Sequence, residues 1–135
     1  MKVKLEDDGE DNSELIEEIE DSFIEEYIPL SGQYEINEYR IIDLANAQVI
    51  WEDKILPLTA KEHDILEVLV RNANHIVTID ALCEAVWGDN PFGYGNSLLA
   101  HIRRIREKIE ITPSKPKSLI TVKGLGYKIN VESRL

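Results

Sequence analysis

The sequence has little that would cross-link it or hold it in a membrane. It contains one cysteine, Cys83, so a framework of disulfide bonds is excluded and a reducing cytoplasm is the expected compartment. Because Cys83 lies in the apolar segment 81–87, we expect it to be a small buried residue. No apolar stretch approaches the roughly 18 residues of a membrane span, and the acidic N-terminus is unlike a signal peptide.

The patterns of enzymes and cofactor-binding proteins are also missing. The histidines, His63, His75 and His101, lack the spacing of metal ligands, and we expect the first two to be surface or capping residues. Gly124 and Gly126 fall in an expected hairpin turn, whereas a phosphate-binding loop joins a strand to a helix. The sequence therefore predicts no enzyme, no metal site and no cofactor.

Positive charge is scarce except near the C-terminus. The chain has a formal net charge of −11, to which residues 1–33 contribute −10, residues 34–95 contribute −7 and residues 96–135 contribute +6. A basic C-terminal third in an acidic chain indicates a polyanionic partner.

Two regions are predicted, an acidic tail over residues 1–33 and a folded domain over residues 34–135. Within the tail, residues 13–28 have the pattern of an amphipathic helix, and a linker follows. We expect its apolar stripe to dock on this chain or on a second copy, although a solvated tail is the alternative. The stripe consists of Leu15, Ile19, Phe23 and Tyr27.

The folded domain begins with an antiparallel meander of three or four strands over residues 33–58. Thr59 and Glu62 form a capping box at the start of the first helix. Residues 76–78 are a candidate short strand. The second helix, residues 79–88, is expected to turn Leu82, Ala85 and Val86 inward and to stop at Gly88.

A third helix over residues 96–110 separates an apolar stripe from a basic face. Its stripe is Leu98, Ile102, Ile105 and Ile109, and the remaining positions carry three arginines and a lysine. A basic helix face alone is weak evidence for any function. Three helices followed by a basic hairpin with a glycine turn, residues 119–131, have the α+β layout of a winged helix-turn-helix protein.

Four segments carry a resemblance to a known family: "LTAKEHDILEVLV", "LCEAVWG", "HIRRIREKI" and "LITVKGLGYKI". From residue 34 to 131 the chain resembles the DNA-binding effector domain of OmpR/PhoB-type response regulators of two-component systems. The resemblance implies an N-terminal antiparallel sheet, three helices and a C-terminal hairpin wing. Residues 1–33 are too few for a receiver domain, so we expect a regulator without one in this chain.

The resemblance also implies a set of contacts. It places Arg104 at base edges in the major groove and the wing at the minor groove or backbone, with Tyr127 near a phosphate. Trp87 matches a position that touches the DNA backbone, and a core position is the alternative. The expected DNA-binding residues are Trp87, Asn96, Ser97, Ala100, His101, Arg103, Arg104, Arg106, Lys108, Thr121, Lys123 and Tyr127. The loop expected to contact RNA polymerase is Asp89, Asn90, Pro91, Phe92, Gly93 and Tyr94.

The sequence departs from the family at the start of the third helix. Asn96 and Leu99 stand where family members commonly have an arginine and an aspartate. Asn96 is expected to serve as an N-cap, and Leu99 to extend the apolar surface.

The favoured interpretation is a sequence-specific regulator that binds double-stranded DNA as a homo-oligomer, such as a dimer, on repeated half-sites. The alternative is a winged-helix protein-interaction module that uses its acidic helix and binds DNA weakly or not at all. The net charge favours the second interpretation, and the arginines with the wing favour the first.

Overall fold

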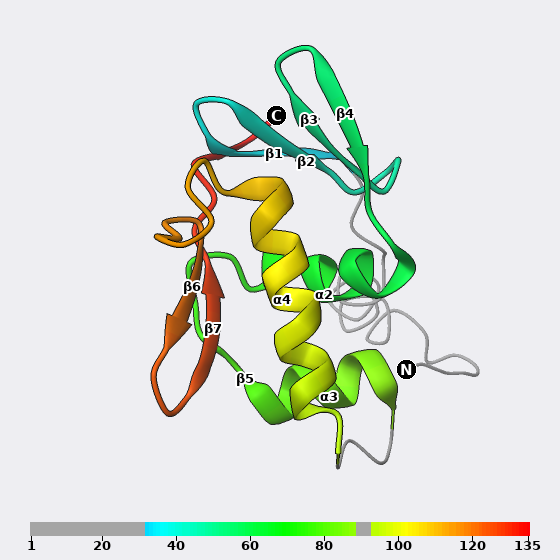
Figure 1. Cartoon of the computed structure of the whole chain (residues 1–135), viewed down its shortest axis with the longest axis vertical. Coiled ribbons are helices and arrows are strands. Elements are labelled where there is room, and N and C mark those ends of the chain that lie inside the picture. Colours follow the sequence, from blue (N-terminus) through cyan, green and yellow to red (C-terminus); the bar gives the residue numbers. More distant parts are fainter. Residues whose placement is uncertain (1–31, 89–92) are drawn as a thin grey trace, which may run out of the picture.

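The computed structural model describes residues 32–88 and 93–135 and has the predicted α+β winged helix-turn-helix fold (Figure 1). The predicted tail helix with Leu15, Ile19, Phe23 and Tyr27 lies outside the described residues, as do Asp89, Asn90, Pro91 and Phe92. In chain order the elements are β1 (Gln33–Asn37), β2 (Arg40–Asp43), β3 (Gln48–Trp51), β4 (Lys54–Pro57), α2 (Ala60–Arg71), β5 (Val77–Thr78), α3 (Ile79–Trp87), α4 (Gly95–Ile109), β6 (Leu119–Val122), β7 (Gly126–Ile129) and β8 (Ser133–Arg134).

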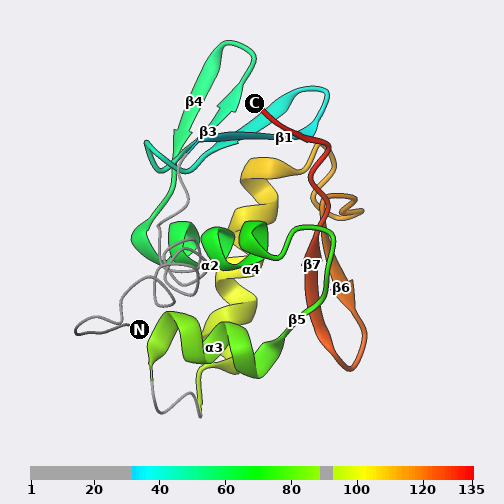
Figure 2. The ribbon, with the colours of Figure 1, turned by 180° about the vertical axis from the view of Figure 1, so that it is seen from behind.

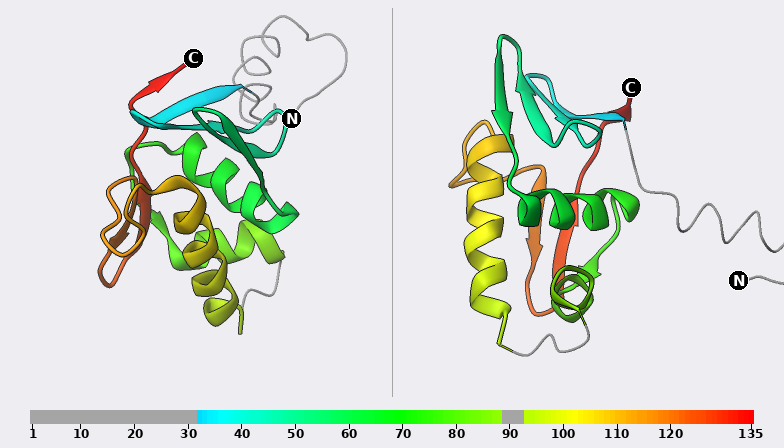
Figure 3. Two further views of the ribbon diagram at one scale, coloured as in Figure 1. Left: turned by 45° about the horizontal axis from the view of Figure 1, so that its top comes forward. Right: turned by 90° about the vertical axis from the view of Figure 1, so that its right-hand side faces the viewer.

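Two sheets flank the helices. One has the strand order β4-β3-β2-β1-β8 and lies across the C-terminal end of α4; the other, β5-β7-β6, lies along its side (Figures 1 and 2). Figure 3 shows α4 along one side of the domain, with α2 and α3 packed across its inner surface. Within the described ranges, every helix is too short or too polar to cross a membrane.

The predicted meander is confirmed with four strands, because β1 to β4 pair in sequence as antiparallel neighbours. Alternation divides their side chains between two faces. Tyr34, Ile42 and Val49 are aligned across the strands and buried against the helices. The two-residue strand β8 near the C-terminus pairs with β1, a pairing that no sequence pattern predicted.

Helices α2 and α3 largely follow their predicted patterns. The Thr59–Glu62 capping box is confirmed, and Gly88 ends α3 with a φ of 92°. Cys83 is buried as expected, with 3% of its surface exposed. The prediction for Ala85 was wrong, because this residue is exposed and Cys83 joins Leu82 and Val86 on the inner side.

The apolar stripe predicted for α4 is confirmed, since each of its four residues is at most 1% exposed. Strands β6 and β7 form the predicted hairpin, hereafter the wing. Gly124 has a φ of 79° in its turn, a conformation that glycine adopts without steric cost. Gly126 packs against β5, where an added Cβ would lie 2.0 Å from the carbonyl oxygen of Val77. The wing is therefore fitted closely to the helical part of the domain.

Candidate nucleic-acid interface

One side of α4 is open to solvent, and we call it the outer face of α4. It consists of Asn96, Ser97, Leu99, Arg103, Arg104 and Glu107, all exposed, and Ala100 at its centre is half-buried. Tyr94 occupies the N-cap position of α4, and its side chain makes no capping hydrogen bond. The prediction of Asn96 as the N-cap was therefore wrong, because the helix already begins at Gly95.

The guanidinium groups of Arg103 and Arg104 are available for an external ligand. Both side chains are exposed, and within the described part of the chain neither takes part in a hydrogen bond or an ion pair. Glu107 lies one turn after Arg103 but does not pair with it. Because an arginine presents a fork of N–H donors, two such groups on one helix suit guanine edges and phosphates.

Arg106 points to the wing. Its Nε and Nη2 atoms donate to the carbonyl oxygen of Leu119 at 3.0 and 2.8 Å, and Nη2 also donates to Oγ1 of Thr121 at 2.9 Å. Burial lowers the pKa of the Arg106 guanidinium. Arg106 and Thr121 thus fix the position of the wing on α4. Their predicted contacts with DNA stay predictions, and this geometry does not favour the one assigned to Arg106.

Lys108 points toward the first sheet. Its Nζ atom donates to Glu62 Oε1 at 2.6 Å and to the carbonyl oxygen of Pro57 at 2.7 Å. Glu62 is 1% exposed; burial raises the pKa of its carboxyl, but hydrogen bonds from Lys108 and from the Thr59 N–H outweigh burial and leave the pKa lowered. The placement of Lys108 does not favour its predicted contact with DNA.

The C-terminal end of α4 is capped by side chains of the first sheet. Asn37 Nδ2 donates to the carbonyl oxygen of Ile109 at 3.0 Å, and Trp51 Nε1 donates to that of Lys108 at 2.6 Å. These carbonyls have no partner within the helix itself. The sequence did not indicate either capping residue, because no local pattern connects them to a helix more than fifty residues away.

The wing presents one of its predicted residues at its tip. Lys123 is exposed in the turn, next to Gly124. Tyr127, by contrast, is only 4% exposed, and burial raises the pKa of its hydroxyl. Its ring packs in the core with Arg106 above it, so little of its surface remains for the predicted phosphate contact.

A stacked cluster lies where α3 meets α4. The rings of Trp87 and Tyr94 are parallel, with centroids 4.9 Å apart, and His101 is tilted against Trp87 at 6.0 Å. Lys61 lies over the same indole and donates to the carbonyl oxygen of Val86. The half-buried Trp87 therefore has the packing role considered for it, while the DNA contacts of Trp87 and His101 stay predictions.

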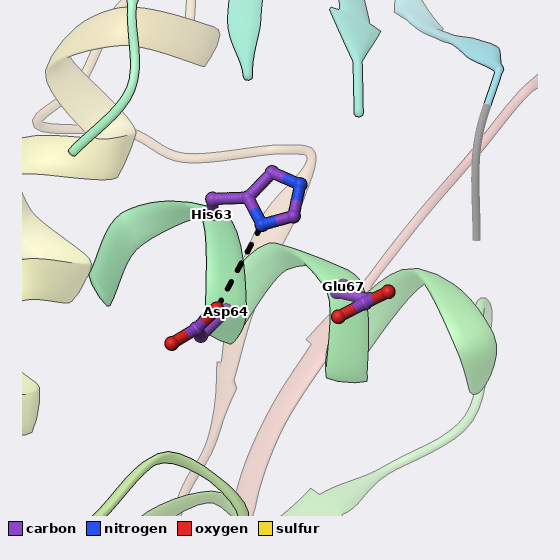
Figure 4. A group of neighbouring side chains, drawn as sticks. All are labelled: His63, Asp64 and Glu67. Carbon is purple, nitrogen blue, oxygen red and sulfur yellow. Dashed lines mark ion pairs between the residues drawn. The ribbon is translucent and has the colours of Figure 1, made fainter. Parts of the chain in front are cut away.

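Histidine and carboxylate side chains meet on α2. The ligand atoms of His63, Asp64 and Glu67 lie within 4.8 Å of one another (Figure 4). His63 Nε2 forms a hydrogen bond with the carbonyl oxygen of Leu44 at 3.0 Å, and Glu67 forms an ion pair with Arg71. The spacing of histidines alone did not reveal this group. Exposed acidic groups gather often without an ion, so the cluster does not by itself indicate a metal site.

Comparison with known proteins agrees with this geometry. Residues 53–129 match the model of the family described as "Transcriptional regulatory protein, C terminal". RegX3 of Mycobacterium tuberculosis is 36% identical over 129 residues, which are 96% of this chain and 50% of that protein. SphR of Synechococcus elongatus is 39% identical over 82 residues, covering 61% of this chain and 32% of that protein. The chain thus spans about half the length of RegX3.

Solved structures show the same fold. Response regulator DrrB of Thermotoga maritima, an OmpR/PhoB homologue, superposes with a TM-score of 0.64 at 29% identity, covering 86% of this chain and 51% of DrrB. The RstA DNA-binding domain of Klebsiella pneumoniae, solved in complex with the RstA box, has a TM-score of 0.61 at 26% identity, covering 73% and 96%. Because the family match spans more than half of its residues, the chain belongs to the C-terminal effector domains of transcriptional regulatory proteins, the OmpR/PhoB-type DNA-binding domains.

Proposed function

We propose that the chain is a sequence-specific transcription regulator that binds double-stranded DNA through the outer face of α4 and the wing. The observation that carries the proposal is the exposure of Arg103 and Arg104, unpaired among the described residues, on a helix whose opposite side is core. An α-helix fits the major groove, which is about 12 Å wide. The wing lies beside α4 (Figure 1). In the proposed complex its exposed Lys123 contacts the DNA backbone next to the major groove.

Each residue has a distinct role in this arrangement. Arg104 reads a base edge, where a bidentate bond to guanine O6 and N7 discriminates against the other bases. Arg103 and Lys123 neutralise phosphates. Arg106 acts through the wing by fixing its position, as its bonds to Leu119 and Thr121 support.

The net charge of −11 does not oppose this proposal. The Debye length is about 8 Å at physiological salt, so distant carboxylates are screened from a phosphate at α4. A few phosphate contacts per chain give modest affinity, and for this reason we propose binding as a homo-oligomer on repeated half-sites. Contact of the 89–94 loop with RNA polymerase is proposed on the family resemblance, and Gly93 and Tyr94 are its described residues.

The test begins with selection of duplexes from a random library by the 135-residue chain. Fluorescence anisotropy then gives the affinity for the selected duplex at several salt concentrations. Each phosphate contact contributes about 0.9 to the slope of log affinity against log salt. We expect the pair of substitutions R103A and R104A to reduce both the slope and the preference for the selected sequence.

A matched control removes two positive charges elsewhere. Lys115 and Lys117 have exposed side chains in the loop before the wing, so K115A with K117A makes the same change in net charge. The control should leave the sequence preference intact. Equal losses in both double variants would contradict a specific role for α4. Absence of salt-dependent binding by the unaltered chain would favour the protein-interaction module.

A further inference from the structure

The outer face of α4 carries one large apolar side chain that the core does not use. Leu99 is 53% exposed, whereas its neighbour Leu98 is 1% exposed. Residues three and four apart lie on the same side of a helix, so Leu99 stands between Asn96 and Arg103. Its exposure is thus a property of the face that the proposed function turns toward DNA.

Two arginines and one glutamate surround Leu99, so the formal charge beside it is net positive. Leu99 borders a groove between α4 and the loop before the wing, which Arg103, Arg106, Glu107 and Pro113 also line. An apolar side chain next to arginines suits a negatively charged partner that also presents an apolar group. It suits a purely apolar protein surface poorly, because the arginines would lose their hydration there. In the major groove that apolar group is the C5-methyl of thymine.

We propose that Leu99 contacts a thymine methyl group in the major groove and thereby selects an A·T pair in the binding site. The inference rests on the proposed function, which places α4 in that groove. Leu99 and Arg104 are five residues apart, a rise of about 7.5 Å along the helix. This rise exceeds the spacing of about 3.4 Å between stacked base pairs, so we expect the thymine at a different base pair from the one that Arg104 reads.

Replacement of thymine by deoxyuridine tests the contact, because it removes the methyl group and nothing else. In the duplex selected by the full chain, each thymine is replaced in turn and the affinity is measured by anisotropy. At one or two positions we expect uracil to weaken binding by the unaltered chain about three- to fourfold, the effect of losing one buried methyl group. The L99A variant should bind thymine and uracil duplexes equally at those positions.

The matched control is Leu125, an exposed leucine in the wing turn with 55% of its surface accessible. The wing, which we place at the minor groove or the backbone, meets no thymine methyl group there, because that group lies in the major groove. L125A should therefore retain the full sensitivity to uracil. Thermal unfolding of L99A and of a second variant, L99Q, checks that the domain remains folded, as the exposure of Leu99 leads us to expect.

Two results would overturn this inference while leaving the proposed function in place. One is the same uracil sensitivity in L99A as in the unaltered chain at every position. The other is loss of self-association in L99A with uracil sensitivity retained, which would assign Leu99 to a second copy of the chain. Failure to select any sequence would instead overturn the proposed function, and the inference with it.

Discussion

An N-terminal part and a shorter C-terminal part of α4 use positive charge in different ways. In the N-terminal part, residues 95–104, Arg103 and Arg104 are exposed and make no bond within the described part of the chain. In the C-terminal part, residues 105–109, Arg106 is bonded to the wing and Lys108 to Glu62. The four cationic side chains lie within six positions of the sequence, yet two of them are exposed on the surface and two form hydrogen bonds within the domain.

This difference shows what holds the outer face of α4 in place. The C-terminal part is fixed from two sides, by the wing through Arg106 and by the first sheet through Asn37 and Trp51. Substitutions of Arg103 or Arg104 should therefore change DNA binding and leave stability unaltered, and those of Arg106 or Lys108 should do the reverse.

The largest effect on stability is expected for K108A. It leaves the Glu62 carboxylate, 1% exposed, without its cation. Leaving this buried carboxylate without its cation costs about 1–3 kcal/mol of unfolding free energy, since Lys108 itself is only partly buried, with 23% of its side chain exposed. Urea unfolding measures this loss. The DNA affinity of the folded fraction should stay within a factor of two. A large selective loss of affinity would instead support the predicted contact of Lys108 with DNA.

Arg104 should show the opposite behaviour. R104A removes a base-reading group and should cost about 1–3 kcal/mol of discrimination between the selected duplex and random DNA. The free energy of unfolding should change by less than about 0.5 kcal/mol, as is usual for surface substitutions. Anisotropy and urea unfolding on one preparation give both values. A stability loss comparable to that of K108A would remove the distinction between the two parts of α4.

For Arg106 the substitution R106K separates charge from shape. Lysine keeps the positive charge but cannot donate the two hydrogen bonds that Arg106 makes to the carbonyl oxygen of Leu119. Leu119 is fully buried, so water does not readily replace these bonds. We expect a loss of about 1–2 kcal/mol in unfolding free energy. The salt slope of DNA binding should be unchanged. A phosphate-binding role would instead predict normal stability and altered affinity.

Stability should also fall in acid. Burial opposes ionisation of Glu62 and Asp43, but hydrogen bonds to each carboxylate prevail, and both pKa values lie below the ordinary values of 4.5 and 3.8. A lowered pKa in the folded state contributes stability that is present above the ordinary value and is lost as the pH falls through the folded-state value. Thermal unfolding measured from about pH 5 down to about pH 2 should show this decline in stability. D43N should make it shallower.

Periodicity accounts for what the sequence predicted well. Leu98, Ile102, Ile105 and Ile109 recur at helical spacing, and one buried side of a helix imposes that spacing whatever its partner is. The Thr59–Glu62 box was equally predictable, because both of its bonds are local.

The sequence was least informative where contacts join distant parts of the chain. Arg106 and Arg104 have the same chemistry, and only the arrival of β6 distinguishes them. The cap of α4 by Trp51 spans 57 residues and follows no local rule. Ala85 was wrongly predicted to be buried, because Cys83 and not Ala85 lies with Leu82 and Val86 on the inner side of the short helix α3.

The buried thiol of Cys83 has a practical consequence. Burial raises its pKa, and the thiolate is the species that reacts with alkylating reagents, so the native domain should react slowly. As the chain has one cysteine, labelling reports opening of the α3 region without any substitution. The rate of modification thereby becomes a direct measure of how often this part of the domain opens, with DNA present or absent.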